Sequence, residues 1–69
     1  MARYPEIRVS VHSSSPLAQV SLVRQAMRQA GIGRDEISRF SFEALSDPDP
    51  HRMREVCGRW VAMDRPALQ

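Results

Sequence analysis

The sequence predicts a small, mostly helical α+β domain in which one N-terminal strand is followed by three helices. Six residues near the N-terminus alternate between apolar and polar side chains, which is the period of a strand. Three later segments carry apolar residues at helical spacing. A chain of 69 residues also has room for only one hydrophobic core, so residues 1–69 are expected to form a single domain.

The strand is expected over residues 7–12. Its β-branched apolar residues share one face, and its polar residues Arg8, Ser10 and His12 share the other. An isolated strand cannot satisfy its own backbone hydrogen bonds. It must therefore pair either with the same strand of a second chain or with another segment of its own chain.

The strand has two possible partners. Within the chain, Phe40–Ala44 or Trp60–Met63 would have to supply the second strand. Pairing between chains would give an intertwined homodimer. We favour the homodimer, because a lone core in so short a chain is marginal and a second chain enlarges it.

The first helix is expected over residues 16–30. Ser15 is a typical N-cap residue, and Pro16 suits the first helical position. The segment then continues without a helix breaker and carries an apolar stripe on one face. Gly31 follows in the position that commonly ends a helix.

The second helix is expected over residues 34–45, with Asp35 and Glu36 in its first turn, where the helix dipole favours acidic side chains. Phe40–Ala44 also alternates in the manner of a strand. The helix is the favoured interpretation, and the strand is the alternative.

The third helix is expected over residues 50–63, after the break at residues 46–50. Asp49 can cap it, and its apolar residues follow helical spacing up to Trp60, the expected aromatic anchor of the core. Residues 1–5 and 65–69 are expected to be flexible tails.

The charge is mildly basic and unevenly distributed. The chain has ten basic residues, all of them arginine, and a net charge of +2. Residues 1–33 hold four arginines and one glutamate, a surplus of three, whereas residues 34–69 hold six arginines and seven acids. The basic first half suggests an anionic partner, because guanidinium groups bind phosphate and carboxylate in a bidentate manner.

The sequence points to a cytoplasmic protein with no membrane partner. No apolar run approaches the ~20 residues that cross a bilayer, and the N-terminus has no signal-peptide pattern. The single cysteine, Cys57, excludes an internal disulfide, whereas small secreted domains are usually rich in disulfides.

No enzyme, cofactor or metal site is expected. His12 and the three serines that follow it fit the end of a strand and a helix cap. Cys57 and His51 lie six residues apart, about 120° apart around a helix, so a thiolate–base pair is not formed. The acidic residues around Asp49 are best explained as helix punctuation.

The remaining candidates are surface residues. Arg8, Ser10 and His12 line the polar face of the strand, while Arg24 and Arg28 are one turn apart on the first helix. Alternate side chains of a two-stranded ribbon can read bases in the major groove of DNA. The sequence therefore leaves two functions open: a small DNA-binding regulator, and a protein-interaction module without a nucleic-acid role.

The order strand, helix, glycine turn, helix over about Ile7–Leu45 resembles the ribbon-helix-helix DNA-binding proteins. The segment Gly31–Ile37 stands where that family has its turn and the start of its second helix. The resemblance implies a homodimer, base reading by Arg8, Ser10 and His12, and a backbone contact at Gly33 and Arg34. The sequence departs from the family in the acids Asp35 and Glu36 and in the third helix.

A second resemblance extends over about Arg24–Val61. Ala30-Gly31-Ile32, then Glu36-Ile37 with Phe40 and Glu43-Ala44, and finally Arg59-Trp60-Val61 are similar to a family of short uncharacterised bacterial reading frames. That family implies no particular chemistry.

Overall fold

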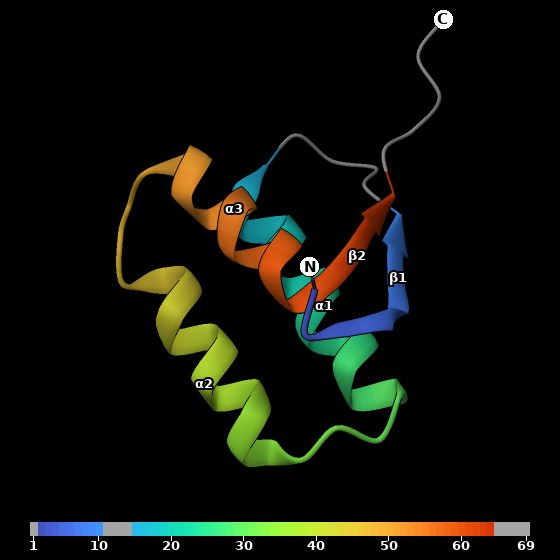
Figure 1. Ribbon diagram of the computed structural model, residues 1–69. Coiled ribbons are helices and arrows are strands. Elements are labelled where there is room, and N and C mark those ends of the chain that lie inside the picture. The colour runs from blue at the N-terminus through green and yellow to red at the C-terminus, as the bar shows by residue number, and fades with distance from the viewer. Residues whose placement is uncertain (1, 11–14, 65–69) are drawn as a thin grey trace, which may run out of the picture.

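The computed structural model describes residues 2–10 and 15–64. Helices dominate them, and two short strands lie near the two ends of the chain (Figure 1). The elements in chain order are β1 (Tyr4–Ser10), α1 (Pro16–Gln29), α2 (Arg34–Leu45), α3 (Pro50–Trp60) and β2 (Val61–Asp64). The prediction of an α+β chain with an N-terminal strand and three helices is confirmed, and a second strand is added.

The second strand solves the pairing problem within the chain. β2 pairs with β1 in parallel, with Arg8 opposite Ala62 and Val9 opposite Met63. The backbone N–H of Arg3 also donates to the carbonyl of Arg59 at 2.8 Å. The strand therefore has an internal partner at Val61–Asp64, close to the alternative Trp60–Met63, and not the favoured partner strand of a second chain. The homodimer stays a prediction, and strand pairing no longer requires it.

The predicted end of the third helix is wrong, because α3 ends at Trp60 and not at residue 63. Val61 continues the apolar spacing of the helix, so the sequence pattern alone carries it onward. Its backbone is extended, with φ −137° and ψ 164°. The unpaired backbone groups of β1 explain the change, since residues 61–64 satisfy them only as a strand.

The predicted start of the first strand is also wrong. β1 begins at Tyr4, so Tyr4 and Pro5 belong to the sheet and not to a flexible tail. The ladder is irregular between Tyr4 and Arg8, and Pro5, which has no N–H to donate, lies inside this interval. The predicted residues 11 and 12 of the strand, including His12, lie outside the described residues.

The helix boundaries follow the local signals. Ser15 caps α1 by accepting from the N–H of Ala18, and Asp49 caps α3 by accepting from the N–H of His51 at 3.0 Å. Gly31, which follows the C-cap of α1, has φ 83°. Phe40–Ala44 is helical, which confirms the favoured interpretation of that segment.

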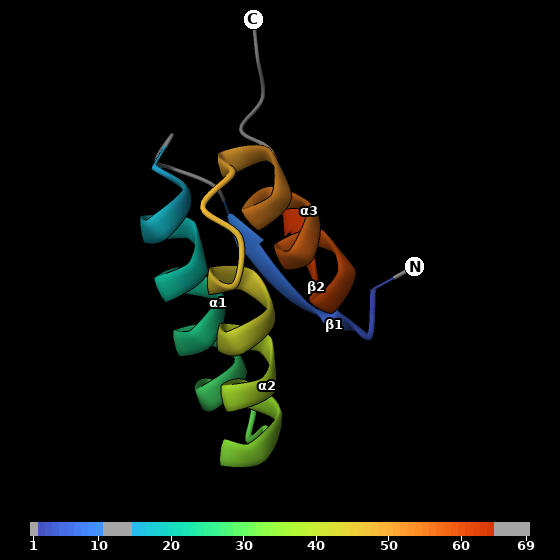
Figure 2. The same cartoon turned by 90° about the vertical axis from the view of Figure 1, so that its left-hand side faces the viewer.

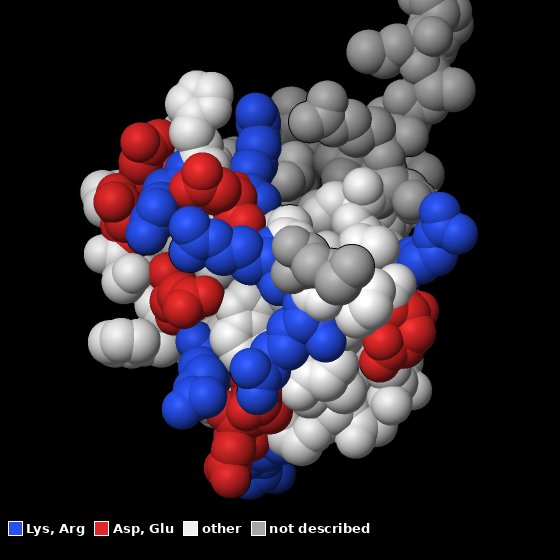
Figure 3. Space-filling view, in the orientation of Figure 1, with Lys and Arg blue, Asp and Glu red and all other residues white. Residues whose placement is uncertain are grey.

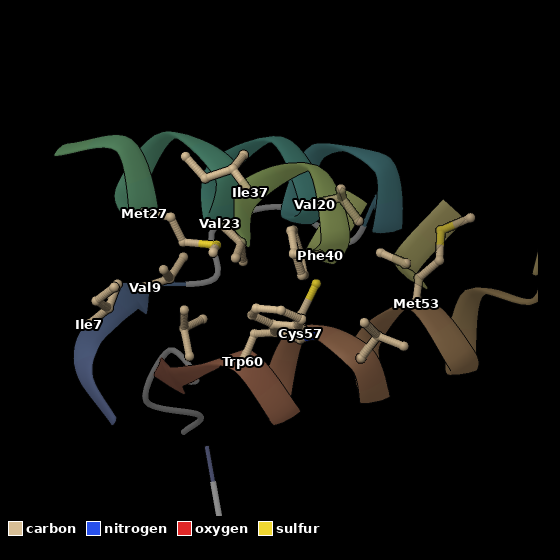
Figure 4. Packing of buried hydrophobic residues seen from close by; sticks show 13 residues of the cluster. Ile7, Val9, Val20, Val23, Met27, Ile37, Phe40, Met53, Cys57 and Trp60 are labelled. Carbon is tan, nitrogen blue, oxygen red and sulfur yellow. The ribbon is translucent and has the colours of Figure 1, made fainter. Parts of the chain in front are cut away.

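The core lies where the three helices meet the sheet. In Figure 4, Phe40 of α2 points toward Cys57 and Trp60 of α3, while Val23 and Met27 of α1 close the core from the opposite side. Ile7 and Val9 of β1 are buried in the same cluster, as their alternation predicts. Trp60 is 5% exposed and packs edge-on against Phe40 with ring centroids 5.8 Å apart, which confirms it as an aromatic anchor.

Two helices, α1 and α2, form one face of the molecule. α1 and α2 run side by side in opposite directions, joined by the short turn at residues 30–33 (Figure 2). α3 packs across both of them, on the side of the sheet. Among the described residues, no helix has the length and apolar character needed to cross a bilayer.

Candidate anion-binding groove

An open groove of about 610 Å³ runs between α1 and α2. We call it the arginine groove, and its lining residues are Arg24, Arg28, Ile32, Arg34, Ile37, Ser38 and Ser41. Arg24 and Arg28 are one turn apart on α1, so their side chains leave the same face of that helix. Arg34 is the first residue of α2 and faces them across the turn that joins the helices.

The three arginines of the groove are electrostatically uncompensated. All three are exposed, and none makes an ion pair with any residue that the structure describes. The lining residues include no aspartate or glutamate. Three guanidinium groups therefore share one groove with only serine hydroxyls and apolar side chains between them, an arrangement that attracts an anion.

One residue that lines the groove, Ser41, has a polar atom without a partner among the described residues. The Oγ atom of Ser41 is shielded from solvent and makes no hydrogen bond within the described part of the chain. Ser38, one turn earlier on α2, lines the same groove and is exposed. A buried hydroxyl normally finds a partner, so Ser41 carries an unsatisfied donor beneath the surface of the groove.

Glu36, in the first turn of α2, does not neutralise the groove. Glu36 points to the other side of the helix, where its Oε1 atom accepts from the Arg3 Nε atom at 2.8 Å and from the Tyr4 hydroxyl at 3.0 Å. Arg39 lies 4.0 Å from the second carboxylate oxygen of Glu36. Glu36 thus joins the N-terminal segment to α2.

These contacts continue onto Trp60. The Trp60 indole Nε1 donates to Glu43 at 2.8 Å, and the guanidinium carbon of Arg3 lies 5.4 Å from the Trp60 ring centroid. The Tyr4 ring is 6.3 Å from Trp60. We call Arg3, Tyr4, Glu36, Glu43 and Trp60 the polar clamp, because together they hold β1, α2 and the end of α3 to one another.

The structure divides the predicted site residues into two groups. Arg24, Arg28 and Arg34 come together in the arginine groove, and Gly33 precedes Arg34 as the N-cap of α2. Arg8 and Ser10 are exposed on β1, which Figure 1 places on the opposite side of the molecule from α2. His12 lies outside the described residues. One short stretch of ligand in the groove therefore does not reach β1.

Sequence reasoning missed the α2 side of the groove. Ser38, Ser41 and Ile37 become lining residues only once α2 is packed against α1 in this register. The available signal was the serine spacing of three, which places Ser38 and Ser41 on one face of α2. That spacing does not reveal which helix the face meets.

The other candidate residues show no activated chemistry. Cys57 is completely buried, and burial raises the pKa of its thiol to about 11, so it is a neutral thiol at neutral pH and not an activated nucleophile. His51 is exposed at the start of α3. Within residues 2–10 and 15–64, no three histidine, cysteine, aspartate or glutamate residues gather as metal ligands.

The face of the molecule drawn in Figure 3 carries charges of both signs. Figure 3 shows arginines and carboxylates next to one another over α2 and α3. Leu17, Phe42 and Leu45 are the large apolar residues that stay exposed in the described part of the chain, at 59%, 79% and 48%. Leu17 lies at the start of α1, and the other two lie near the end of α2.

Comparison with models of protein families, with curated proteins and with solved structures finds no match for this chain.

Proposed function

We propose that this protein binds DNA without catalysing a reaction, and that the arginine groove contacts the phosphate backbone. The observation that carries the proposal is the group of three arginines without an ion-pair partner among the described residues or an acid in the groove lining. Placing three like charges together is unfavourable in the free protein, and an anionic partner offsets that cost.

The contact is with the backbone and not with the bases. Guanidinium groups in a groove between two helices can pair with successive phosphates, which positions a protein on DNA without reading sequence. Base reading by Arg8 and Ser10 belongs to the ribbon-helix-helix resemblance and needs a second chain beside β1. It is a separate part of the proposal, because these residues lie away from the groove.

The test is a titration of a short fluorescent DNA duplex by anisotropy at several salt concentrations. We expect log K to fall linearly with log salt, with a slope that decreases by about 0.9 for each groove arginine replaced by glutamine. Arg54→Gln is the matched control, since Arg54 is exposed on α3 and lies outside the groove lining. The proposal fails if Arg24→Gln and Arg28→Gln change the slope no more than Arg54→Gln does.

A protein-interaction module is the second candidate, and a specific observation favours it. The exposed side chains of Leu17, Phe42 and Leu45 are not explained by a DNA contact. Sedimentation equilibrium over a range of protein concentrations tests self-association through them. If they form an interface between copies, Phe42→Ser shifts the equilibrium toward the monomer; an unchanged monomeric mass in both proteins removes this interface.

A further inference from the structure

The exposed ring of Phe42 is the feature that a contact with the DNA backbone leaves unexplained. Phe42 is 79% exposed, more than any other large apolar residue in the described part of the chain. Phenylalanine is usually buried, and the core side of α2 buries Phe40 together with Ile37 and Ala44. The ring of Phe42 is therefore a flat apolar surface that faces solvent in the free protein.

Helical spacing places Phe42 beside the arginine groove. Arg34, Ser38 and Phe42 follow one another at intervals of four residues, so they form one stripe along α2. Arg34 and Ser38 line the groove, and Ser41, the residue before Phe42, lines it as well. Eight residues of an α-helix rise by ~12 Å, so the ring lies about two turns from Arg34, next to the end of the groove that Ser41 lines.

The charges change along this stripe. The three arginines of the groove surround the beginning of α2, and Asp35 in its first turn is not a lining residue. After Phe42 the chain carries Glu43, Asp47 and Asp49, with no arginine among them. A phosphate is therefore attracted to the groove and repelled by the segment that follows Phe42. A partner that extends from the groove onto the ring consequently places an uncharged group there.

A nucleobase meets both requirements. It is flat and uncharged, and bases stack on aromatic side chains with little regard for sequence. The phosphates of the same strand carry the negative charge that guanidinium groups bind. In a duplex the bases are already paired and stacked on one another, so only an unpaired base can lie on the ring without the cost of opening the duplex.

We infer that the arginine groove and Phe42 together form a site for an unpaired stretch of a DNA strand, in which the arginines pair with phosphates and one base stacks on the ring of Phe42. The inference rests on the proposed function for the phosphate contact and adds to it the form of DNA that the site prefers. A basic groove that follows the backbone, combined with an aromatic ring for a base, is the arrangement by which proteins bind single strands.

The experiment compares three fluorescent ligands by anisotropy at one salt concentration. The first is a deoxythymidine strand of about 12 nucleotides, within the usual site sizes for single-strand binding. The second is the duplex of that strand with its complement, and the third is a strand of the same length with abasic sugars in place of the thymidines. We expect the wild type to bind the thymidine strand about tenfold more tightly than the abasic strand, because the two differ only in their bases. The duplex should also bind more weakly than the thymidine strand.

Substitutions of Phe42 separate base stacking from a general apolar contact. Phe42→Leu keeps an apolar side chain and removes the ring, so it should weaken binding of the thymidine strand about tenfold and leave the abasic strand unchanged. Phe42→Tyr keeps the ring and should bind as the wild type does. Leu45→Ala, at another exposed apolar residue of α2, is the matched control and should change neither affinity. Arg28→Gln should weaken both strands alike, since both carry the same phosphates.

The outcomes separate this inference from the proposed function. If groove arginines set the salt slope of the duplex, but the wild type binds the thymidine and abasic strands equally, the base contact is overturned and the phosphate contact stands. If the thymidine strand is preferred and depends on the ring of Phe42, while the duplex does not bind, the single-strand site stands and the contact with a duplex is removed.

Two further results would overturn the role of Phe42. Equal weakening of the thymidine strand by Phe42→Leu and Phe42→Tyr would show that the ring does not carry the contact. Sedimentation at the protein concentrations of the binding assay gives the other: if Phe42→Leu lowers the mass of the protein, a second copy covers the ring. Because Phe42 is 79% exposed, we expect thermal unfolding of Phe42→Leu to match that of the wild type. The comparison of the thymidine and abasic strands needs no variant.

Discussion

The polar clamp and the arginine groove lie on opposite sides of α2. Charged groups are paired in the clamp and are not paired in the groove within the described residues. In the clamp, the guanidinium of Arg3, the hydroxyl of Tyr4 and the indole N–H of Trp60 all reach a carboxylate within 3.0 Å. In the groove, Arg24 and Arg28 have no such partner within the described residues. One helix therefore separates a surface whose polar groups are satisfied from one whose polar groups are not.

We therefore expect the polar clamp to contribute to stability and the arginine groove to contribute to binding. Satisfied polar groups over a buried aromatic ring hold β1 and α3 in place, and their removal should weaken the fold. Unsatisfied like charges do not stabilise the fold, and in the proposed function they contact the DNA backbone. This assignment is contradicted if substitutions in the polar clamp leave the free energy of unfolding unchanged, or if substitutions in the arginine groove unfold the protein.

The largest expected effect is that of Trp60→Ala. Trp60 is 5% exposed, packs against Phe40 and Tyr4 and donates to Glu43, so its loss leaves a cavity and an unpaired carboxylate. We expect ~3–5 kcal/mol of destabilisation, enough to unfold a marginal domain. Urea unfolding followed by circular dichroism measures it. Trp60→Phe keeps most of the ring and should lose much less; equal losses in the two variants would show that ring volume is not what matters.

The pH dependence that Cys57 gives to the free energy of unfolding tests whether water reaches the interior next to the polar clamp. Burial raises the pKa of the Cys57 thiol from 9.0 to about 11. The folded protein therefore keeps a proton that the unfolded chain releases. Its contribution is fully present below pH 9 and is lost progressively as the pH rises through 11.

The measurement is the difference in free energy of unfolding between the wild type and Cys57→Ala at a series of pH values. The difference should decrease as the pH rises from 9 toward 11, because only the wild type has the titrating thiol. Titrations common to both proteins cancel in this difference. A constant difference over that range would mean that water reaches the Cys57 thiol in the folded protein.

A smaller effect is expected in the turn that joins the two walls of the groove. Gly31 has φ 83°, and a Cβ atom there would meet no atom within 4 Å, so Gly31→Ala acts through the backbone alone. We expect it to destabilise the protein by about 1 kcal/mol. Gly58→Ala is the control in α3, where space is equally open, and it should stabilise by up to ~1 kcal/mol. Thermal unfolding of both variants gives the sign; a stabilising Gly31→Ala would contradict the left-handed turn.

Signals that act over a few residues predict much of this fold. Ser15, Asp49 and the prolines that follow them set the starts of α1 and α3, because caps act within one turn. Whether Val61 is helical or extended does not follow from the residues next to it in the sequence. Its apolar side chain suits the helical stripe and the core-facing side of a strand equally, and the decision comes from β1, more than fifty residues earlier in the chain.

The same distinction applies to the groove. Arg24 and Arg28 could be grouped from the sequence, because a spacing of four fixes their relation within one helix. Arg34 was named only through the resemblance to ribbon-helix-helix proteins, which implies a backbone contact at the start of the second helix. Ser41 could not be assigned, since its position opposite the α1 arginines depends on how α1 and α2 pack. Local periodicity therefore predicts which residues share a helix face, and tertiary packing determines which faces meet.

The smallest expected change, and the sharpest contrast between the two surfaces, comes from removing one positive charge on each side of α2. Arg28→Gln relieves repulsion from Arg24 one turn away, so stability should stay within ~0.5 kcal/mol of the wild type or rise slightly. Arg3→Gln removes the 2.8 Å bond to Glu36 and the contact with the Trp60 ring, so it should destabilise.

Salt separates the two variants further. Arg3 pairs with Glu36 at the surface, so added salt should shrink the stability difference between Arg3→Gln and the wild type. Salt also screens the repulsion within the groove, and any gain from Arg28→Gln should fade in the same titration. The measurement is urea unfolding of the three proteins at low and high salt. A destabilising Arg28→Gln would mean that the groove arginines hold the fold, and the division between a stabilising clamp and a binding groove would be lost.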